Sequence, residues 1–182
     1  KEIRRAENRE AGKTILFSLG GDGTFLQASD LIAPHRIPIL GINLGKLGFL
    51  TGLDSYNLEE KLTEIFEGKS SIKKLSRLSC DFEPEVGASK YSSTALNEVT
   101  ITRGAATGLA ELELFLDSKK VATYPGDGLI VSTPTGSTAY SLSCGGPLIT
   151  RNTAAFSITP LNVHKLGLRP IICSDKTKME IK

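Results

Sequence analysis

Histidine, cysteine and tryptophan are scarce in this sequence of 182 residues, which has two His, three Cys and no Trp. Cys80, Cys144 and Cys173 show no CxxC spacing, so we expect neither a zinc site nor a disulfide framework. Such thiols favour a reducing compartment, and we predict a cytoplasmic protein. Two histidines are too few for His-rich metal chemistry, so we predict no metal-ligating residues in the chain.

Long apolar runs and an excess of one charge are absent as well. No run of 18 or more apolar residues occurs, so the sequence predicts no membrane span. The 22 Lys and Arg residues nearly balance the 20 Asp and Glu residues, for a net charge of +2. This charge does not fit a protein that binds nucleic acid through phosphate neutralisation. We therefore expect neither nucleic acid nor a membrane as a partner.

The first part of the chain alternates strand and helix patterns. The apolar run Thr14–Leu19 predicts a strand that stops at a glycine cluster. Thr24–Ala33 predicts a helix, and Ile37–Gly41 a second strand. Asn57–Glu67 predicts a helix that Asn57 can cap. Its apolar face consists of Leu58, Leu62, Ile65 and Phe66. The alternation indicates a parallel α/β layer.

The pattern changes to short strands after about residue 72. The alternating segments predict a mostly antiparallel β domain, and Asp117–Lys119 predicts a hairpin turn. The expected strands are Thr94–Thr102, Leu112–Leu116, Val121–Tyr124, Leu129–Ser132, Phe156–Thr159 and Leu168–Cys173. We predict an α/β domain over residues 1–71, followed by a β-rich, sandwich-like domain over residues 72–182.

Glycine is abundant, with 18 residues, and the segment Gly20–Thr24 (GGDGT) lies between a predicted strand and a predicted helix. Glycines there leave backbone N–H groups free for phosphate oxygens at a helix N-terminus. Asp22 can contact a sugar hydroxyl or a metal. The alternative is a plain tight turn, since Asp-Gly is a common turn pair. GxxxxGK[ST], GxGxxG and GxSxG are all absent, which excludes a P-loop, the dinucleotide fingerprint and a hydrolase elbow.

Two further segments can carry chemistry. In Asp127–Tyr140 a strand ends in a hydroxyl-rich loop, where Ser137 and Thr138 can cap a short helix that runs to about Ser143. Hydroxyls beside an aromatic ring suit a flat base, although a polar turn explains them equally well. The pair Asn97-Glu98 falls inside an apolar strand, where one of two adjacent side chains faces inward. A solvent-facing Glu is the commoner case.

Taken together, these segments resemble the NAD kinase family over about residues 14–173. The resemblance rests on the order and spacing of Gly20–Thr24, Asn43–Leu50, Leu96–Val99, Asp127–Tyr140, Gly145–Pro147, Thr159–His164 and Arg169-Pro170. GGDGT alone is shared with diacylglycerol, sphingosine and 6-phosphofructo-kinases. The segment Asp127–Tyr140 is much more specific to the family.

The resemblance implies a role for each motif. NAD would lie in a cleft between two domains, where Asp22 contacts the adenosine ribose and assists removal of the 2′-hydroxyl proton. Asn97 and Glu98 would hold ribose hydroxyls, and Asp127 would contact the nicotinamide end. The adenine would be surrounded by Phe49, Thr138, Ala139, Tyr140 and Ser143. The donor phosphates would face Gly20, Gly21, Gly23 and Thr24, and Gly23 would also contact NAD.

By this resemblance the chain forms NADP from NAD, with ATP or polyphosphate as donor, a divalent cation such as Mg²⁺, and a homo-oligomeric assembly. A lipid or sphingoid kinase that shares the GGDGT turn is one alternative, and an inactive NAD-binding module is another. The chain is short for the family, so the first domain is expected to be incomplete at its N-terminus.

Overall fold

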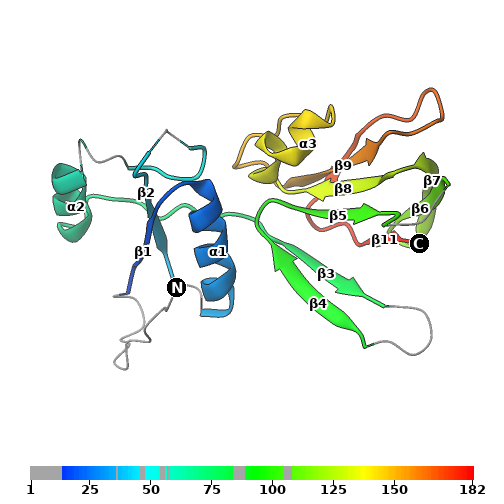
Figure 1. The fold of residues 1–182 in the computed structure, drawn as a ribbon. Helices are drawn as coiled ribbons and strands as arrows, with labels where there is room; N and C mark the ends of the chain where they lie inside the picture. Colours follow the sequence, from blue (N-terminus) through cyan, green and yellow to red (C-terminus); the bar gives the residue numbers. More distant parts are fainter. Residues whose placement is uncertain are drawn as a thin grey trace. The chain divides into compact units, whose positions relative to one another are not determined.

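The computed structural model describes residues 14–35, 37–45, 48–53, 56, 58–83, 89–104 and 108–182 (Figure 1). The chain divides into two compact units, Lys1–Lys73 and Lys74–Lys182. The predicted helix cap Asn57 lies outside the described residues. Within the described part of the chain, no helix is both long and apolar enough to cross a bilayer.

The first unit contains the predicted strand–helix–strand arrangement. Its elements are β1 (Leu16–Leu19), α1 (Asp22–Ile32), η1 (Ala33–His35), β2 (Ile39–Ile42) and α2 (Leu58–Phe66). Strands β1 and β2 pair in parallel, with Leu16 opposite Ile39 and Leu19 opposite Ile42, which confirms the predicted parallel α/β layer.

Helix α1 begins at Asp22, two residues before the predicted start at Thr24. The N–H groups of Thr24 and Phe25 both donate to the carbonyl of Gly21, at 3.0 and 3.2 Å. Gly21 is therefore the N-cap, and Asp22 and Gly23 already belong to the first turn. A carboxylate in the first turn interacts favourably with the helix dipole.

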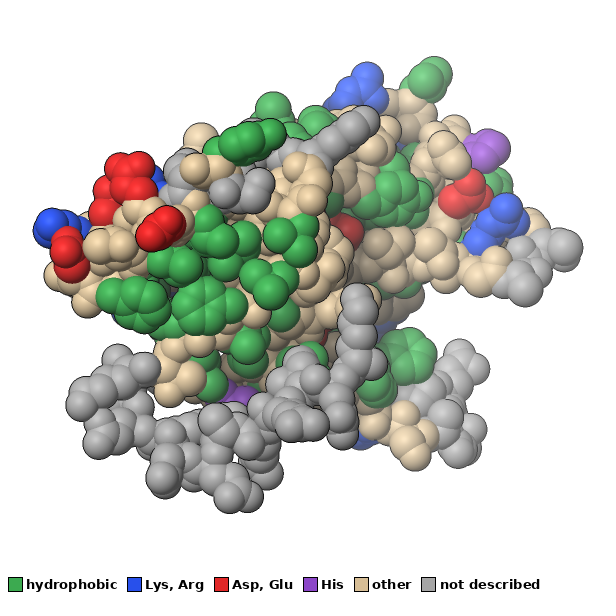
Figure 2. Space-filling model, turned by 60° about the vertical axis from the view of Figure 1, so that its left-hand side comes forward, with side chains coloured by type: hydrophobic (Ala, Val, Ile, Leu, Met, Phe, Trp, Pro, Cys, Tyr) green, Lys and Arg blue, Asp and Glu red, His purple; other side chains and the backbone are tan. Residues whose placement is uncertain are grey.

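Helix α1 covers one face of the two-stranded sheet. Phe25, which is 8% exposed, packs against β2, and a Cβ added at Gly41 would lie 2.9 Å from its ring. The side chains of Phe17 and Leu19, which alternate along β1 with the buried Ser18, are 40% and 57% exposed. Figure 2 shows hydrophobic side chains gathered on one face of the molecule.

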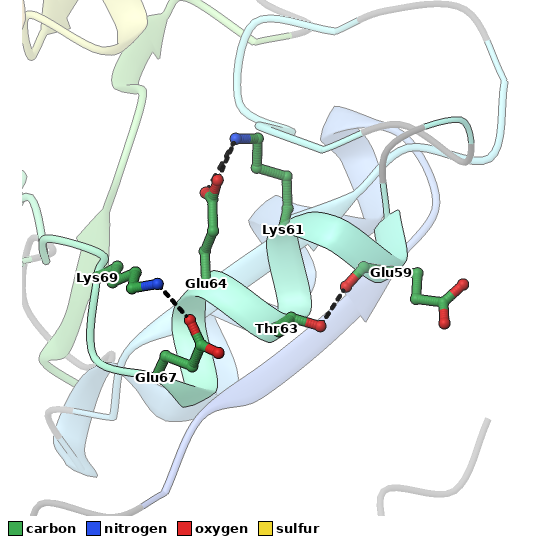
Figure 3. A network of polar contacts seen from close by, with 6 residues as sticks. All are labelled: Glu59, Lys61, Thr63, Glu64, Glu67 and Lys69. Atoms are coloured by element: carbon green, nitrogen blue, oxygen red, sulfur yellow. Dashed lines mark hydrogen bonds and ion pairs between the residues drawn. The ribbon is translucent and has the colours of Figure 1, made fainter.

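Polar contacts lie on the surface of helix α2 and of the turn that follows it (Figure 3). Lys61 pairs with Glu64 at 2.9 Å, and Lys69 pairs with Glu67 at 2.6 Å. Exposed pairs of this kind contribute roughly 0–1 kcal/mol each. The predicted apolar face is less buried than expected: none of its residues is fully buried, and Phe66 is 74% exposed.

The second unit is built from antiparallel strands. They are β3 (Leu78–Phe82), β4 (Tyr91–Ala95), β5 (Glu98–Thr102), β6 (Ala110–Leu116), β7 (Lys119–Gly126), β8 (Gly128–Ser132), β9 (Ala155–Leu161), β10 (Ile171–Ser174) and β11 (Met179–Ile181). The strand orders are β10-β9-β8-β5, β11-β6-β7 and β3-β4. Two short helical segments, η2 (Gly136–Thr138) and α3 (Tyr140–Ser143), follow β8.

One hydrophobic core joins the sheets of this unit. Its buried residues come from both larger sheets and from β3: Leu78, Leu114, Tyr124, Leu129, Val131, Phe156 and Ile158. Side chains from two sheet faces that pack together make a β-sandwich. The predicted sandwich-like β domain is confirmed.

The predicted strand Thr94–Thr102 is wrong as a single strand. It breaks at Leu96-Asn97 into β4 and β5, which belong to different sheets. Thr133 holds this bend: its hydroxyl donates to the carbonyl of Leu96 at 2.6 Å, and its N–H donates to the carbonyl of Asn97 at 2.9 Å. These bonds to a distant loop take the place of strand pairing, so local alternation did not reveal the break.

The turn between β6 and β7 agrees with the sequence. Asp117 and Ser118, at φ of 48° and 66°, form the two-residue turn between β6 and β7, where a hairpin was predicted. Pro125 lies in β7, and β7 is an edge strand of its sheet. A proline that cannot donate a ladder hydrogen bond is tolerated at such an edge.

Candidate active site

Asp22 accepts two hydrogen bonds from the backbone of a distant loop. Oδ2 accepts the N–H of Phe49 at 2.8 Å, and Oδ1 accepts the N–H of Leu50 at 2.9 Å. Gly48 permits this approach, since a Cβ there would lie 2.2 Å from Oδ1. The carboxylate is half-buried at the start of α1, while Phe49 is 66% exposed.

In the glycine turn before α1, two backbone N–H groups already donate within the chain. The N–H of Gly20 donates to the carbonyl of Ile42, and the N–H of Thr24 donates to that of Gly21. Gly20 adopts a φ of 143°, and a Cβ there would lie 2.6 Å from the hydroxyl of Thr24. Since Gly21 and Gly23 precede the first helical hydrogen bonds, their N–H groups are the ones that a phosphate could meet.

Hydroxyls of the loop after β8 are bonded inside the second unit. The Ser137 hydroxyl donates to the carbonyl of Pro134 at 2.7 Å and accepts the N–H of Ile149 at 3.0 Å. The Thr138 hydroxyl donates to the carbonyl of Thr135. Neither caps a helix, and the predicted single helix is broken at Ala139, whose φ and ψ are −100° and −132°.

Helix α3 sits against β9 through hydroxyl and glycine contacts. The hydroxyls of Ser141 and Thr159, both fully buried, lie 3.0 Å apart. A Cβ at Gly146 would lie 2.2 Å from the Ser141 hydroxyl, so only glycine fits where the chain leaves α3. This packing fixes Tyr140 and Ser143, which stand on the outer side of α3 with exposed side chains.

Asn97 and Glu98 carry acceptor oxygens that other protein groups do not use. Among the described residues, neither Asn97 Oδ1 nor Glu98 Oε2 has a hydrogen-bond partner, although both atoms are buried. Burial raises the pKa of Glu98. Acceptors of this kind are costly unless they meet a donor, and a ligand hydroxyl is such a donor.

A pocket of about 410 Å³ lies within the second unit. Its lining brings together three predicted site residues, Asp127, Tyr140 and Ser143. The remaining lining residues are Thr102, Arg103, Gly104, Cys144, Pro160, Leu161 and Asn162. The neighbouring Cys144 thiol raises the pKa of the Tyr140 hydroxyl. Thr138 and Ala139, which were also predicted, are half-buried and do not line this pocket.

Two residues that the sequence did not single out hold Asp127. Arg103 Nε lies 3.0 Å from Asp127 Oδ1, and Asn162 Nδ2 donates to Oδ2 at 2.9 Å. Asn162 adopts a left-handed φ of 44°, which is uncommon for a residue other than glycine. The only indication in the sequence was that Asn162 falls inside Thr159–His164, one of the segments on which the family resemblance rests.

The predicted site residues therefore fall into two groups, one in each unit. The first unit holds Gly20, Gly21, Asp22, Gly23, Thr24 and Phe49, and the second holds Asn97, Glu98, Asp127, Thr138, Ala139, Tyr140 and Ser143. Across the described ranges, no three His, Cys, Asp or Glu side chains are grouped so that they could hold a metal ion. All three cysteines are free.

Family models match both units. A model described as the ATP-NAD kinase N-terminal domain matches residues 3–70, and one described as the ATP-NAD kinase C-terminal domain matches residues 96–182. Curated relatives agree. The NAD kinase of Flavobacterium psychrophilum is 42% identical over 168 residues, and that of Francisella tularensis subsp. novicida is 45% identical over 172 residues. Each alignment covers 92% of this chain and 57% of the relative, so the chain spans little more than half of their length.

Solved structures give the same result. A yeast NADH kinase complexed with NADH matches with a TM-score of 0.87 and 32% identity, over 92% of this chain and 50% of the other. An NAD kinase from Archaeoglobus fulgidus in complex with ATP matches with a TM-score of 0.75 and 29% identity, over 92% of this chain and 64% of the other. The N-terminal and C-terminal domain models match in that order along the chain, and the curated relatives and solved structures agree with them. The chain therefore belongs to the NAD kinase family.

Proposed function

We propose that the protein containing this chain is an NAD kinase. It transfers the γ-phosphoryl group of ATP, or a phosphoryl group of polyphosphate, to the 2′-hydroxyl of the adenosine ribose of NAD and forms NADP. Since the chain spans little more than half of its relatives, the activity is proposed for the whole protein.

The observation that carries this proposal is the pair of buried acceptors on Asn97 and Glu98. Sugar hydroxyls are donors that would satisfy Asn97 Oδ1 and Glu98 Oε2. The pocket lined by Asp127, Tyr140 and Ser143 supplies an aromatic ring and polar groups for the rest of the dinucleotide. Together these features suit a ligand that has both ribose and flat rings.

Asp22 is the proposed catalytic residue. Phosphoryl transfer depends mainly on positioning and on electrostatic stabilisation, so the protein needs few reactive groups. A carboxylate has roughly four lone-pair sites, and the two loop N–H groups use two of them. The others can accept the hydrogen bond of a ribose hydroxyl and then its proton. The N–H groups of Gly21 and Gly23 would face the donor phosphates.

The donor phosphates need a divalent cation such as Mg²⁺ to offset their charge. The described residues provide no cluster of carboxylates that would form a protein cage for it. Mg²⁺ commonly keeps several waters and binds through substrate phosphates. We propose that the ion arrives with ATP. The role of Asp22 as the base does not require any side chain of the protein to bind this ion.

The test is NADP formation by the full-length protein. We expect NADP to accumulate with NAD, ATP and Mg²⁺, and parallel reactions with polyphosphate identify the donor. Phosphorylation of diacylglycerol or a sphingoid base instead of NAD would replace the proposal by a lipid kinase. Calorimetric binding of NAD without any NADP would indicate an inactive binding module.

Replacing Tyr140 by Ala is expected to weaken NAD binding about tenfold. Its exposed ring lies at the pocket beside Ser143, and stacking of a base on an aromatic ring contributes roughly 1–3 kcal/mol. The measurement is the NAD dissociation constant by calorimetry. Tyr91→Ala is the matched control, because Tyr91 is 64% exposed on β4 and does not line the pocket. Equal dissociation constants for Tyr140→Ala and wild type would remove the ring from the site.

Replacing Glu98 by Gln is expected to raise stability at pH 7 and to weaken NAD binding. Burial gives Glu98 a higher pKa in the folded chain than in the unfolded chain. The folded chain then binds more protons between the two pKa values, so stability falls as pH rises through that window. Glutamine has no such ionisation. Thermal unfolding against pH should show a gain that shrinks as the pH falls to about 4, the ordinary range of a Glu carboxyl. A gain that is equal at every pH would contradict the burial effect.

We also propose a cytoplasmic homo-oligomer. The free cysteines fit a reducing compartment. Sedimentation of the full-length protein checks the assembly, and a monomer at micromolar concentration would contradict it.

A further inference from the structure

The loop that follows β2 is tied to the rest of the first unit by hydrogen bonds at two places. The N–H of Asn43 donates to the carbonyl of Leu53 at 2.7 Å, and that of Leu53 donates to the carbonyl of Gly41 at 3.2 Å. These bonds close the base of the loop against β2. Farther along, the described segment Gly48–Leu50 is held by Asp22 through its two backbone N–H groups.

The two bonds fix the direction of Phe49. Adjacent N–H groups bound to the two oxygens of one carboxylate leave the loop backbone little freedom, and charge-assisted bonds are stronger than neutral ones. The Phe49 side chain is 66% exposed. The Asp22 carboxylate anchors this segment through both of its oxygens.

We propose that Asp22 is also a positioning residue, whose carboxylate holds the Gly48–Leu50 segment so that the Phe49 ring is presented to the adenine of bound NAD. The inference rests on the proposed function for the identity of the ligand. It adds a second role to the carboxylate: the group that takes the hydroxyl proton also fixes a ring that binds the same substrate. NAD then binds to a loop that is already ordered, which lowers the entropy cost of binding.

Gly48 allows the anchor to be broken without removing the carboxylate. An added Cβ would lie 2.2 Å from Asp22 Oδ1 and 2.7 Å from Asp22 Cγ, so Gly48→Ala must push the side chain and the segment apart. Gly48 does not have a positive φ, so alanine adds steric conflict and no backbone strain. Gly52→Ala is the matched control, because nothing lies within 4 Å of a Cβ there.

The first experiment is a double-mutant cycle on NAD binding by the full-length protein. We expect Phe49→Ala to weaken NAD binding about tenfold, and Gly48→Ala to weaken it about three- to fivefold. In the Phe49→Ala background, Gly48→Ala should have a clearly smaller effect, because the part of the anchor that acts through the ring is already lost. General damage to the fold would persist in both backgrounds. Independent effects that multiply would overturn the proposal.

The second experiment does not need NAD. Hydrogen exchange of the Phe49 and Leu50 amides reports the two bonds directly, because an amide of an exposed loop exchanges fast unless it is hydrogen-bonded. We expect protection in the wild type and in Gly52→Ala, and exchange about tenfold faster in Gly48→Ala. Fast exchange in the wild type would overturn the anchor.

The two experiments separate failure of the anchor from failure of the proposed function. If neither the wild type nor any variant bound NAD, the proposed function would fail. Protection of the Phe49 and Leu50 amides could still establish the anchor. If the wild type formed NADP but Gly48→Ala changed neither NAD binding nor exchange, the positioning role would fail and the proposed function would stand.

Discussion

Replacing Asp22 by Asn is expected to lower kcat for NADP formation by about 10²–10⁴-fold, because an amide cannot take the hydroxyl proton. NAD binding should fall by only a few-fold, since Asn keeps one acceptor oxygen for the loop but turns an NH₂ group toward the other N–H. The measurement is turnover at saturating NAD and ATP.

Two controls separate this effect from general damage. Asp30→Asn changes an exposed carboxylate on the same helix and should leave turnover unchanged. Gly48→Ala keeps the carboxylate and releases the loop, so its kcat should fall much less than that of Asp22→Asn. Near-normal turnover by Asp22→Asn would remove this carboxylate from the catalytic role.

Replacing Gly136 by Ala is expected to destabilise the second unit by about 3 kcal/mol. A Cβ there would lie 2.2 Å from the carbonyl oxygen of Asn97 and 2.7 Å from its Cα. These are backbone atoms that Thr133 already holds by a hydrogen bond to Asn97, so the bend between β4 and β5 cannot yield without breaking that bond. The carboxyl group of Glu98 would move with the bend, and NAD binding should be lost.

Urea unfolding of the full-length protein measures the first effect, and calorimetry with NAD measures the second. Gly52→Ala again serves as the control, because the site is open and its φ is ordinary. A Gly136→Ala protein with the wild-type unfolding midpoint would show that the loop after β8 does not press on Asn97.

Local features of the fold could be predicted because neighbouring residues determine them. The apolar run before the GGDGT segment predicted β1, and the residues after it predicted α1. The turn at Asp117-Ser118 was predicted from its polar residues between two alternating segments. The start of α1 was predicted two residues late, because Gly21 caps the helix through its backbone carbonyl and has no side chain that would signal a cap.

The site could be predicted only in part. Asp127 was assigned to the nicotinamide end of NAD and Tyr140 and Ser143 to the adenine, and all three line one pocket. Arg103 and Asn162, which hold Asp127, lie 24 and 35 residues away from it in the sequence. Nothing in the local sequence pairs them with Asp127, because ion pairs between distant strands depend on sheet register.

The sequence by itself determined the alternation of strand and helix, the change to β structure and the residues that could carry chemistry, since short-range periodicity and motif order encode all three. Only the tertiary structure decided where Asp22 directs its two oxygens, where the strand breaks at Leu96-Asn97 and which groups support Asp127. Those features depend on hydrogen bonds and close approaches between segments that are far apart in the chain. Such contacts exist only after the chain has folded.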